Sequence, residues 1–120
     1  MAQAAMQGDV ADATPAIDRV HLKQMTFGDR ALERELLQLF DRQAELLLGR
    51  MRASEPAVLA TLAHTLKGSA AGVGAGEVAQ AAAAVEQAVT RSASECSAAL
   101  DGLAAAIATA RAEIAALLAA

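Results

Sequence analysis

Hydrophobic residues recur along most of the chain with the period of an α-helix. In residues 30–53 the apolar positions are spaced mainly by three, four or seven residues, with charged residues between them. The same period continues through residues 56–72, 76–91 and 92–120, and a shorter apolar group follows Pro15. The positions that define the short first group are Ile17, Val20, Leu22 and Met25. No segment shows the two-residue alternation of a β-strand, so the pattern predicts an all-α fold.

Residues that start or stop helices separate these segments. Thr26 or Asp29 is expected to cap the helix over residues 30–53, and Ser54 or Glu55 the next one, with Pro56 in its first turn. Ser92 begins a Ser-x-x-Glu capping box before the last helix. Short connections make successive helices antiparallel neighbours. We therefore expect an antiparallel up-down four-helix bundle with an additional short N-terminal helix over residues 15–120, preceded by a flexible tail, residues 1–14.

Composition and charge narrow the class of protein. The 120 residues are 55% hydrophobic but only 2% aromatic, so the core must consist of Leu, Val, Ile and Ala, which suits a plain bundle better than a ligand pocket. A formal charge of −4 argues against nucleic acid as a partner. Residues 100–120 are apolar, but Asp101, Arg111 and Glu113 interrupt them, so we expect no membrane span. The single cysteine, Cys96, and the lack of a secretory signal predict a cytoplasmic protein, and we expect a monomer.

The segment His64-Thr65-Leu66-Lys67-Gly68-Ser69 carries the one arrangement that indicates chemistry. An apolar stripe must face the core, and His64 lies almost opposite it on the helix. The stripe consists of Leu59, Leu62, Leu66, Ala70 and Val73. Lys67, Gly68 and Ala71 follow His64 at three, four and seven positions, so they share its exposed face. The pattern predicts an accessible imidazole with an ammonium one turn away.

Gly68 has two interpretations. It could end the helix as a left-handed C-cap, or it could lie within the helix on the exposed face. The apolar stripe continues to Val73, and Gly72 and Gly74 are better terminators, which favours the second interpretation. A glycine inside a helix costs about 1 kcal/mol relative to Ala. Since an exposed glycine does not serve core packing, we expect a partner to approach the backbone there.

The hexapeptide, with Ala63 before it and Gly74-Ala75 after it, resembles the motif of the histidine-containing phosphotransfer (HPt) domain family. The resemblance covers residues 17–89, including the run Leu36-Leu37-Gln38-Leu39-Phe40. It implies that His64 accepts a phosphoryl group, on Nε2, and that Lys67 offsets its charge. Small or polar residues would leave room for docking; these are Ala60, Thr61, Gly68, Ala71 and Gly72.

The resemblance also implies the partners. Receiver domains of response regulators or of a hybrid histidine kinase would donate and accept the phosphoryl group, and they would supply Mg²⁺. This chain would bind no cofactor or metal and, having no ATP-binding segment, would act as a carrier and not as an enzyme. Docking would use exposed apolar residues, drawn from the segment between Ile17 and Phe27 and from Leu32 and Leu36. A polar residue of the preceding helix, Gln38 or Gln43, could bond the neighbourhood of the histidine.

Other functions have less support. A helical adaptor that binds receivers without accepting phosphate is the main alternative, although the intact His64, Lys67 and Gly68 argue against it. The dimerisation helices of a sensor kinase are a weaker alternative, because the chain encodes four long helices itself. His21, His64 and Cys96 lack the spacing of metal ligands, and His21 is expected to be a surface or half-buried residue.

Overall fold

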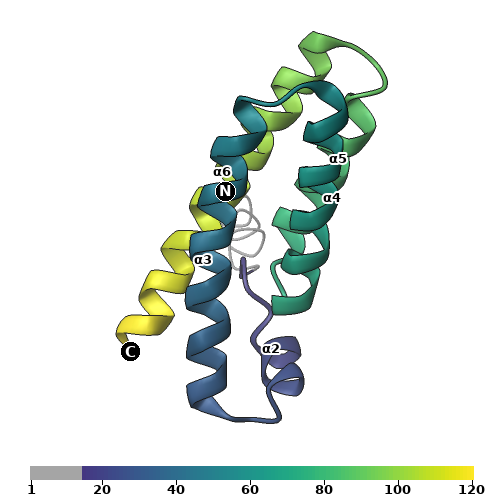
Figure 1. Ribbon diagram of the computed structural model, residues 1–120. Coiled ribbons are helices and arrows are strands. Elements are labelled where there is room, and N and C mark those ends of the chain that lie inside the picture. Colours follow the sequence, from purple (N-terminus) through teal and green to yellow (C-terminus); the bar gives the residue numbers. More distant parts are fainter. Residues whose placement is uncertain (1–14) are drawn as a thin grey trace, which may run out of the picture.

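The computed structural model describes residues 15–120, which contain five α-helices and no strand (Figure 1). The helices are α2 (Arg19–Met25), α3 (Arg30–Arg52), α4 (Pro56–Val73), α5 (Gly76–Ala88) and α6 (Ala93–Ala119). The all-α prediction is confirmed. The predicted flexible tail, residues 1–14, lies outside the described residues.

The four long helices pack side by side around one core. α3 contacts α4 and α6, α5 also contacts α4 and α6, and the short α2 packs against α4. The core is built of aliphatic residues and alanine, with Phe40 as its one aromatic member within the described range. Several alanines are fully buried there, including Ala44, Ala63, Ala70 and Ala82. Such small side chains let neighbouring helices approach closely, as the composition predicts.

The helix ends agree with the expected caps at some positions and differ at others. The Asp29 carboxylate accepts a hydrogen bond from the backbone N–H of Leu32 at 3.1 Å, and the Ser92 hydroxyl accepts one from Glu95 N–H at 3.1 Å. Thr26 does not start a helix. It follows the end of α2, where its hydroxyl donates to the carbonyl of Leu22 at 2.9 Å.

Two helix starts add detail to the expected boundaries. α2, the short helix expected after Pro15, begins at Arg19, because the carboxylate of Asp18 accepts a hydrogen bond from a backbone N–H of its first turn. α4 begins at Pro56 as predicted, but the Glu55 side chain makes no capping hydrogen bond. Proline at this first position has no N–H, so the start of α4 has one unpaired backbone donor fewer to satisfy.

Residues Ala16, Ile17 and Asp18 form an N-terminal strap across the packed helices. The Glu113 carboxylate of α6 accepts hydrogen bonds from the backbone N–H groups of Ala16 and Ile17, both at 2.9 Å. The backbone N–H of Asp18 donates to the carbonyl of Gly74, in the turn after α4, at 2.8 Å. The Ile17 side chain is fully buried. The strap therefore joins α6 to the α4–α5 turn.

α6 is the one described helix that is long and apolar enough, by length and composition, to cross a membrane. In the structure one of its faces lies in the core through Leu103, Ile107, Ala110 and Ile114. On another face Arg111 Nε donates to Asp41 Oδ1 of α3 at 2.8 Å. This hydrogen bond is the main reason that the pKa of Arg111 is raised. These contacts are those of a helix packed within a helical domain.

Candidate functional site

α4 presents His64 to solvent because its opposite face is buried. The five residues of the predicted stripe, from Leu59 to Val73, are all buried. The His64 side chain is 70% exposed. The helix thus places the imidazole on a rigid surface, as its hydrophobic period predicts.

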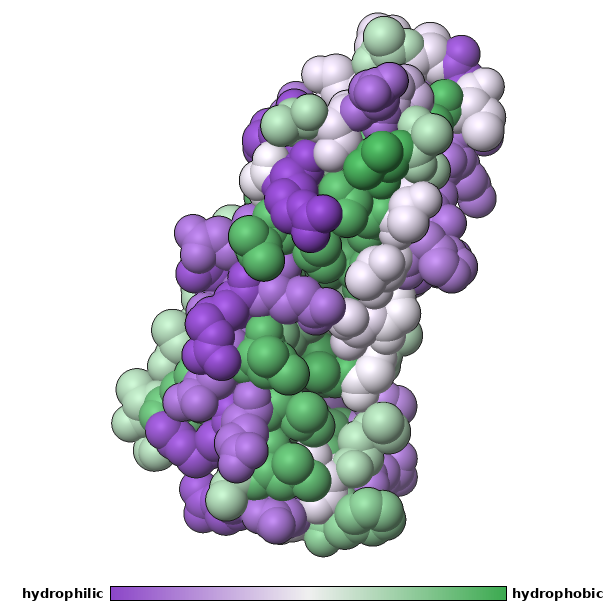
Figure 2. Space-filling view, viewed as in Figure 1, coloured by the Kyte–Doolittle hydropathy of each residue, from purple (hydrophilic) through white to green (hydrophobic). Residues whose placement is uncertain are grey.

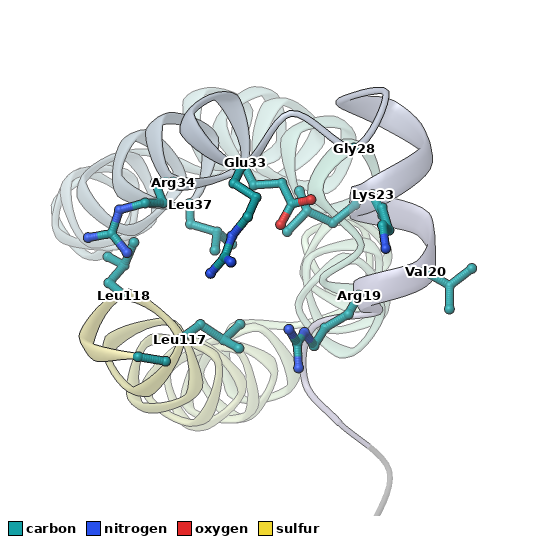
Figure 3. A pocket seen from close by; sticks show the side chains of 12 residues that line it. Arg19, Val20, Lys23, Gly28, Glu33, Arg34, Leu37, Leu117 and Leu118 are labelled. Atoms are coloured by element: carbon teal, nitrogen blue, oxygen red, sulfur yellow. The ribbon is translucent and has the colours of Figure 1, made fainter.

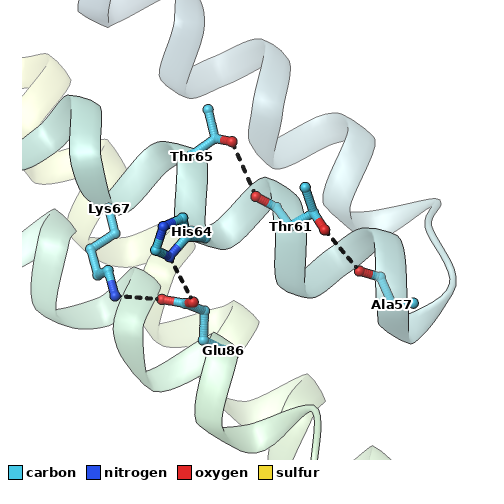
Figure 4. Close-up of polar contacts among 6 residues, drawn as sticks. All are labelled: Ala57, Thr61, His64, Thr65, Lys67 and Glu86. Atoms are coloured by element: carbon cyan, nitrogen blue, oxygen red, sulfur yellow. Dashed lines mark hydrogen bonds and ion pairs between the residues drawn. The ribbon is translucent and has the colours of Figure 1, made fainter.

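Glu86 of α5 connects His64 with Lys67 (Figure 4). Its Oε2 lies 3.0 Å from Nδ1 of His64, and its Oε1 lies 2.9 Å from Nζ of Lys67. One carboxylate therefore holds the imidazole and the ammonium on the surface between α4 and α5. The sequence analysis missed Glu86. Its only signal was an acidic residue near the end of an otherwise alanine-rich helix.

The charge of Glu86 determines how the His64 ring is presented. The pKa of Glu86 is lowered, chiefly by the hydrogen bond from the Lys67 ammonium. Partial burial acts in the opposite direction, and the hydrogen bond to His64 lowers the pKa further. The carboxylate is therefore ionised at neutral pH and can only accept hydrogen bonds. In the neutral imidazole the proton must then be on Nδ1, which leaves the lone pair of Nε2 available.

The predicted docking residues lie on the same helix and carry little bulk. Gly68 and Ala71 are exposed, and Ala60 and Gly72 are half-buried. A Cβ added to Gly68 or Gly72 would meet no other atom within 4 Å. The Thr61 hydroxyl, also exposed, donates back to its own helix at the carbonyl of Ala57 (Figure 4). The surface beside His64 is therefore open.

The two interpretations of Gly68 can now be separated. α4 continues past Gly68 to Val73 and ends at Gly74, which has φ 84° in the left-handed region. Gly68 is not among the described glycines with positive φ, which are Gly28 and Gly74. Gly68 therefore lies within the helix, and the C-cap interpretation is wrong.

Gln38 and Gln43 do not take the place suggested for them. Both belong to α3, where Gln38 is exposed and Gln43 half-buried, and within residues 15–120 neither forms a hydrogen bond with His64. The partner of His64 is Glu86 of the following helix instead. The His64 ring leans towards α5 and not towards the preceding helix α3.

The second histidine lies in a different setting. His21 belongs to α2 and is half-buried, as expected, and its Nε2 is buried without a hydrogen-bond partner among the described residues. Cys96 is a free, half-buried thiol. No group of three or more His, Cys, Asp or Glu side chains in residues 15–120 is placed to hold a metal ion.

The structure divides the predicted apolar docking residues into buried and exposed ones. Ile17 and Leu22 are buried in the core, and Leu36 packs against it. Val20, Met25, Phe27 and Leu32 are exposed. Phe27 is the extreme case: the residue is 94% exposed, and its backbone has φ 55°, a conformation that non-glycine residues rarely adopt. Figure 2 shows a band of hydrophobic surface along the face where α3 and α4 lie side by side.

Comparison with known proteins identifies a family and a fold. The family model of the Hpt domain matches residues 30–120. The X-ray structure of a rice protein assigned as a histidine-containing phosphotransfer protein superimposes with a TM-score of 0.78. The two sequences are 19% identical, and the match covers 97% of this chain and 87% of the rice chain. No curated protein sequence matches.

Proposed function

The chain belongs to the Hpt domain family, and from this premise we propose that it relays a phosphoryl group between receiver-domain aspartates through His64. The observation that carries the proposal is the contact of Glu86 Oε2 with Nδ1 of an exposed His64, which leaves Nε2 free to react. We also infer that α3 to α6, each packed against two of the others, form an antiparallel up-down four-helix bundle.

The proposed transfer is a displacement at phosphorus. The lone pair of His64 Nε2 attacks the phosphorus of an aspartyl phosphate on the receiver. The N–P bond forms as the bond from phosphorus to the aspartyl oxygen breaks, and the aspartate leaves as a carboxylate. The ring keeps its proton on Nδ1, and its developing positive charge is stabilised by Glu86, 3.0 Å away. A second receiver aspartate then attacks the phosphohistidine, and the same bonds change in reverse.

In this scheme Lys67 can pair with two anions, the Glu86 carboxylate and the phosphoryl group on His64. Before transfer its ammonium is bound to Glu86 at 2.9 Å. A phosphoryl group on Nε2 would add negative charge within reach of a side chain one helical turn away. Because the Lys67 side chain is half-exposed and flexible, it can turn towards the phosphoryl oxygens while Glu86 keeps its bond to His64. Glu86 is thus a positioning residue, and Lys67 stabilises the transferred charge.

The receiver is proposed to dock over α4 and the adjoining apolar surface. Gly68, Ala71 and Gly72 would let its backbone come close to His64. Val20 and Phe27, on and just after α2, supply exposed apolar area for such a contact. Magnesium would be held by the receiver's own acidic residues. Action as a carrier without an ATP site, a monomeric state, a cytoplasmic location, and the absence of nucleic-acid and membrane partners remain predictions.

Incubation with a phosphorylated receiver tests the proposal. We expect the protein to gain one acid-labile phosphoryl group by mass spectrometry, the His64→Gln variant to gain none, and the His21→Gln variant to behave as wild type. His64 is exposed, so its replacement should change the free energy of unfolding by less than about 0.5 kcal/mol. Binding of the receiver without any gain of phosphate would favour the adaptor alternative. Phosphate on the His64→Gln variant would assign the acceptor elsewhere.

A further inference from the structure

A cavity of about 610 Å³ opens at the end of the molecule where α2, the start of α3 and the end of α6 meet (Figure 3). Its size is within the range of small-molecule sites in proteins. Its lining contains no residue of α4 or α5 and shares only Val20 with the proposed docking surface. The composition of the chain favours a plain bundle over a ligand pocket in the core, whereas this cavity lies at the end of the molecule.

The walls of the cavity combine apolar and basic side chains. Leucines from three helices form the apolar part: Leu22, Leu37, Leu117 and Leu118. The charged part consists of Arg19, Lys23, Arg30 and Arg34, with Glu33 as the one acidic side chain in the lining. Four of the ten basic residues of a chain with a net charge of −4 are therefore gathered at one opening.

The four basic residues outnumber the one acidic side chain of the lining. None of the four forms an ion pair within residues 15–120. The Glu33 carboxylate accepts a hydrogen bond from the Thr26 hydroxyl at 3.4 Å. Figure 3 shows Arg19 and Arg34 on opposite sides of the opening, with Leu37 and Leu117 along its walls. Like charges that surround one space repel each other, and a bound anion would relieve that repulsion.

We propose that this cavity binds a single-chain amphipathic anion. Its phosphate or carboxylate head would lie between the guanidinium groups of Arg19 and Arg34, which can each form paired hydrogen bonds with such a group. Its alkyl chain would cover Leu37, Leu117 and Leu118. An inorganic anion would leave the half-buried Leu117 and Leu118 in contact with water, and an uncharged amphiphile would leave the cations unpaired, so the lining favours a ligand with both parts.

Isothermal titration calorimetry with three probes tests the ligand class. Decyl phosphate, used below the concentration at which it aggregates, should bind with one site and at least about tenfold more tightly than inorganic phosphate or decyl maltoside. If decyl maltoside bound as tightly as decyl phosphate, the cavity would be a non-specific apolar surface, and the proposal would be overturned. Equal affinity for inorganic phosphate would overturn the role of the leucines. If the protein bound phosphatidic acid in vesicles but not free decyl phosphate, the ligand would be a membrane surface, and the proposal would also be overturned.

Variants locate the binding. Arg19→Ala combined with Arg34→Ala should weaken decyl phosphate binding at least about tenfold. Arg42→Ala combined with Arg50→Ala removes the same charge from exposed positions of α3 outside the cavity and should leave it unchanged. Equal loss in both pairs, or loss in neither, contradicts the assignment. If the Arg19→Ala/Arg34→Ala variant does not fold, Leu118→Asp provides a second test, because it places an acid in the apolar wall. Undiminished binding of decyl phosphate by Leu118→Asp would refute the site. His64→Gln should bind decyl phosphate normally, so this result is independent of phosphotransfer.

Discussion

Two glycines at one end of α4 should respond to the same substitution with opposite signs. Gly68 lies within the helix, where an added Cβ meets nothing within 4 Å. Gly74 ends the helix at φ 84°, where an added Cβ would lie 2.8 Å from the carbonyl oxygen of Asp18. Gly68→Ala should therefore stabilise the protein by up to about 1 kcal/mol, because alanine is the better helix former. Gly74→Ala should destabilise it by about 1–2 kcal/mol from the left-handed backbone alone, with the contact to the strap adding to that loss.

Thermal melts followed by far-ultraviolet circular dichroism measure both effects. For a domain of this size a change of 1 kcal/mol corresponds to a shift in Tm of roughly 4–8 °C. We expect Gly68→Ala to melt higher than wild type by up to that amount, and Gly74→Ala to melt lower by at least as much. A lower Tm for Gly68→Ala would refute the placement of this glycine in the open helix interior.

The functional role of Gly68 is tested by a larger side chain. Gly68→Gln should fold normally but lose phosphotransfer, because the added side chain occupies the space that the receiver must enter. Gly102→Gln is the matched control, since Gly102 is also an exposed glycine within a helix, and a Cβ there also meets nothing within 4 Å. Normal transfer by the Gly68 variant, or an equal loss in the Gly102 variant, would refute the docking argument.

The polar contacts of His64 give three further predictions. Lys67→Ala should slow phosphotransfer by roughly ten- to a hundredfold with much less effect on receiver affinity, which titration of the unphosphorylated receiver measures; an equal loss of affinity would make Lys67 a docking residue. Glu86→Ala should slow uptake more than Glu86→Gln, because the glutamine oxygen can still accept a hydrogen bond from Nδ1–H; equal rates in single-turnover assays would exclude this positioning role. The lowered pKa of Glu86 stabilises the folded protein above the pKa that the carboxyl has when unfolded. The stability of the wild type relative to Glu86→Gln should therefore decrease as the pH falls through the lowered pKa of Glu86. A difference in Tm between the two proteins that stays constant from neutral to acidic pH would contradict this prediction.

The parts of the site that lie on one helix could be predicted from the sequence. The period of the apolar residues fixes which face of α4 is buried, and the exposure of His64 follows from that face alone. The same argument placed Gly68 within the helix. Both predictions depend on residues of one helix, within about four turns of each other, whose relative positions the helix itself determines.

The contacts between helices could not be predicted in this way. Glu86 reaches His64 across 22 positions of sequence, and its direction depends on how α5 is rotated against α4. Periodicity leaves that rotation uncertain, so the sequence suggests a glutamine of α3 as readily as Glu86 of α5. The basic cavity was missed for a related reason. The cavity lies where α2, the start of α3 and the end of α6 surround one opening. Composition predicts how the middle of a helical domain packs, but not how its helix ends are placed.

The N-terminal strap has a consequence for how the protein is made. Ala16 and Ile17 are separated by 97 and 96 positions from Glu113, the side chain that holds them. During synthesis on a ribosome, α4 and α5 can pack soon after they emerge because they are neighbours in sequence, whereas the strap must wait for the last helix. A nascent chain that has not yet reached Glu113 keeps the backbone N–H groups of Ala16 and Ile17 without this acceptor. We therefore expect a protease to cut stalled chains near these residues until the end of α6 is released.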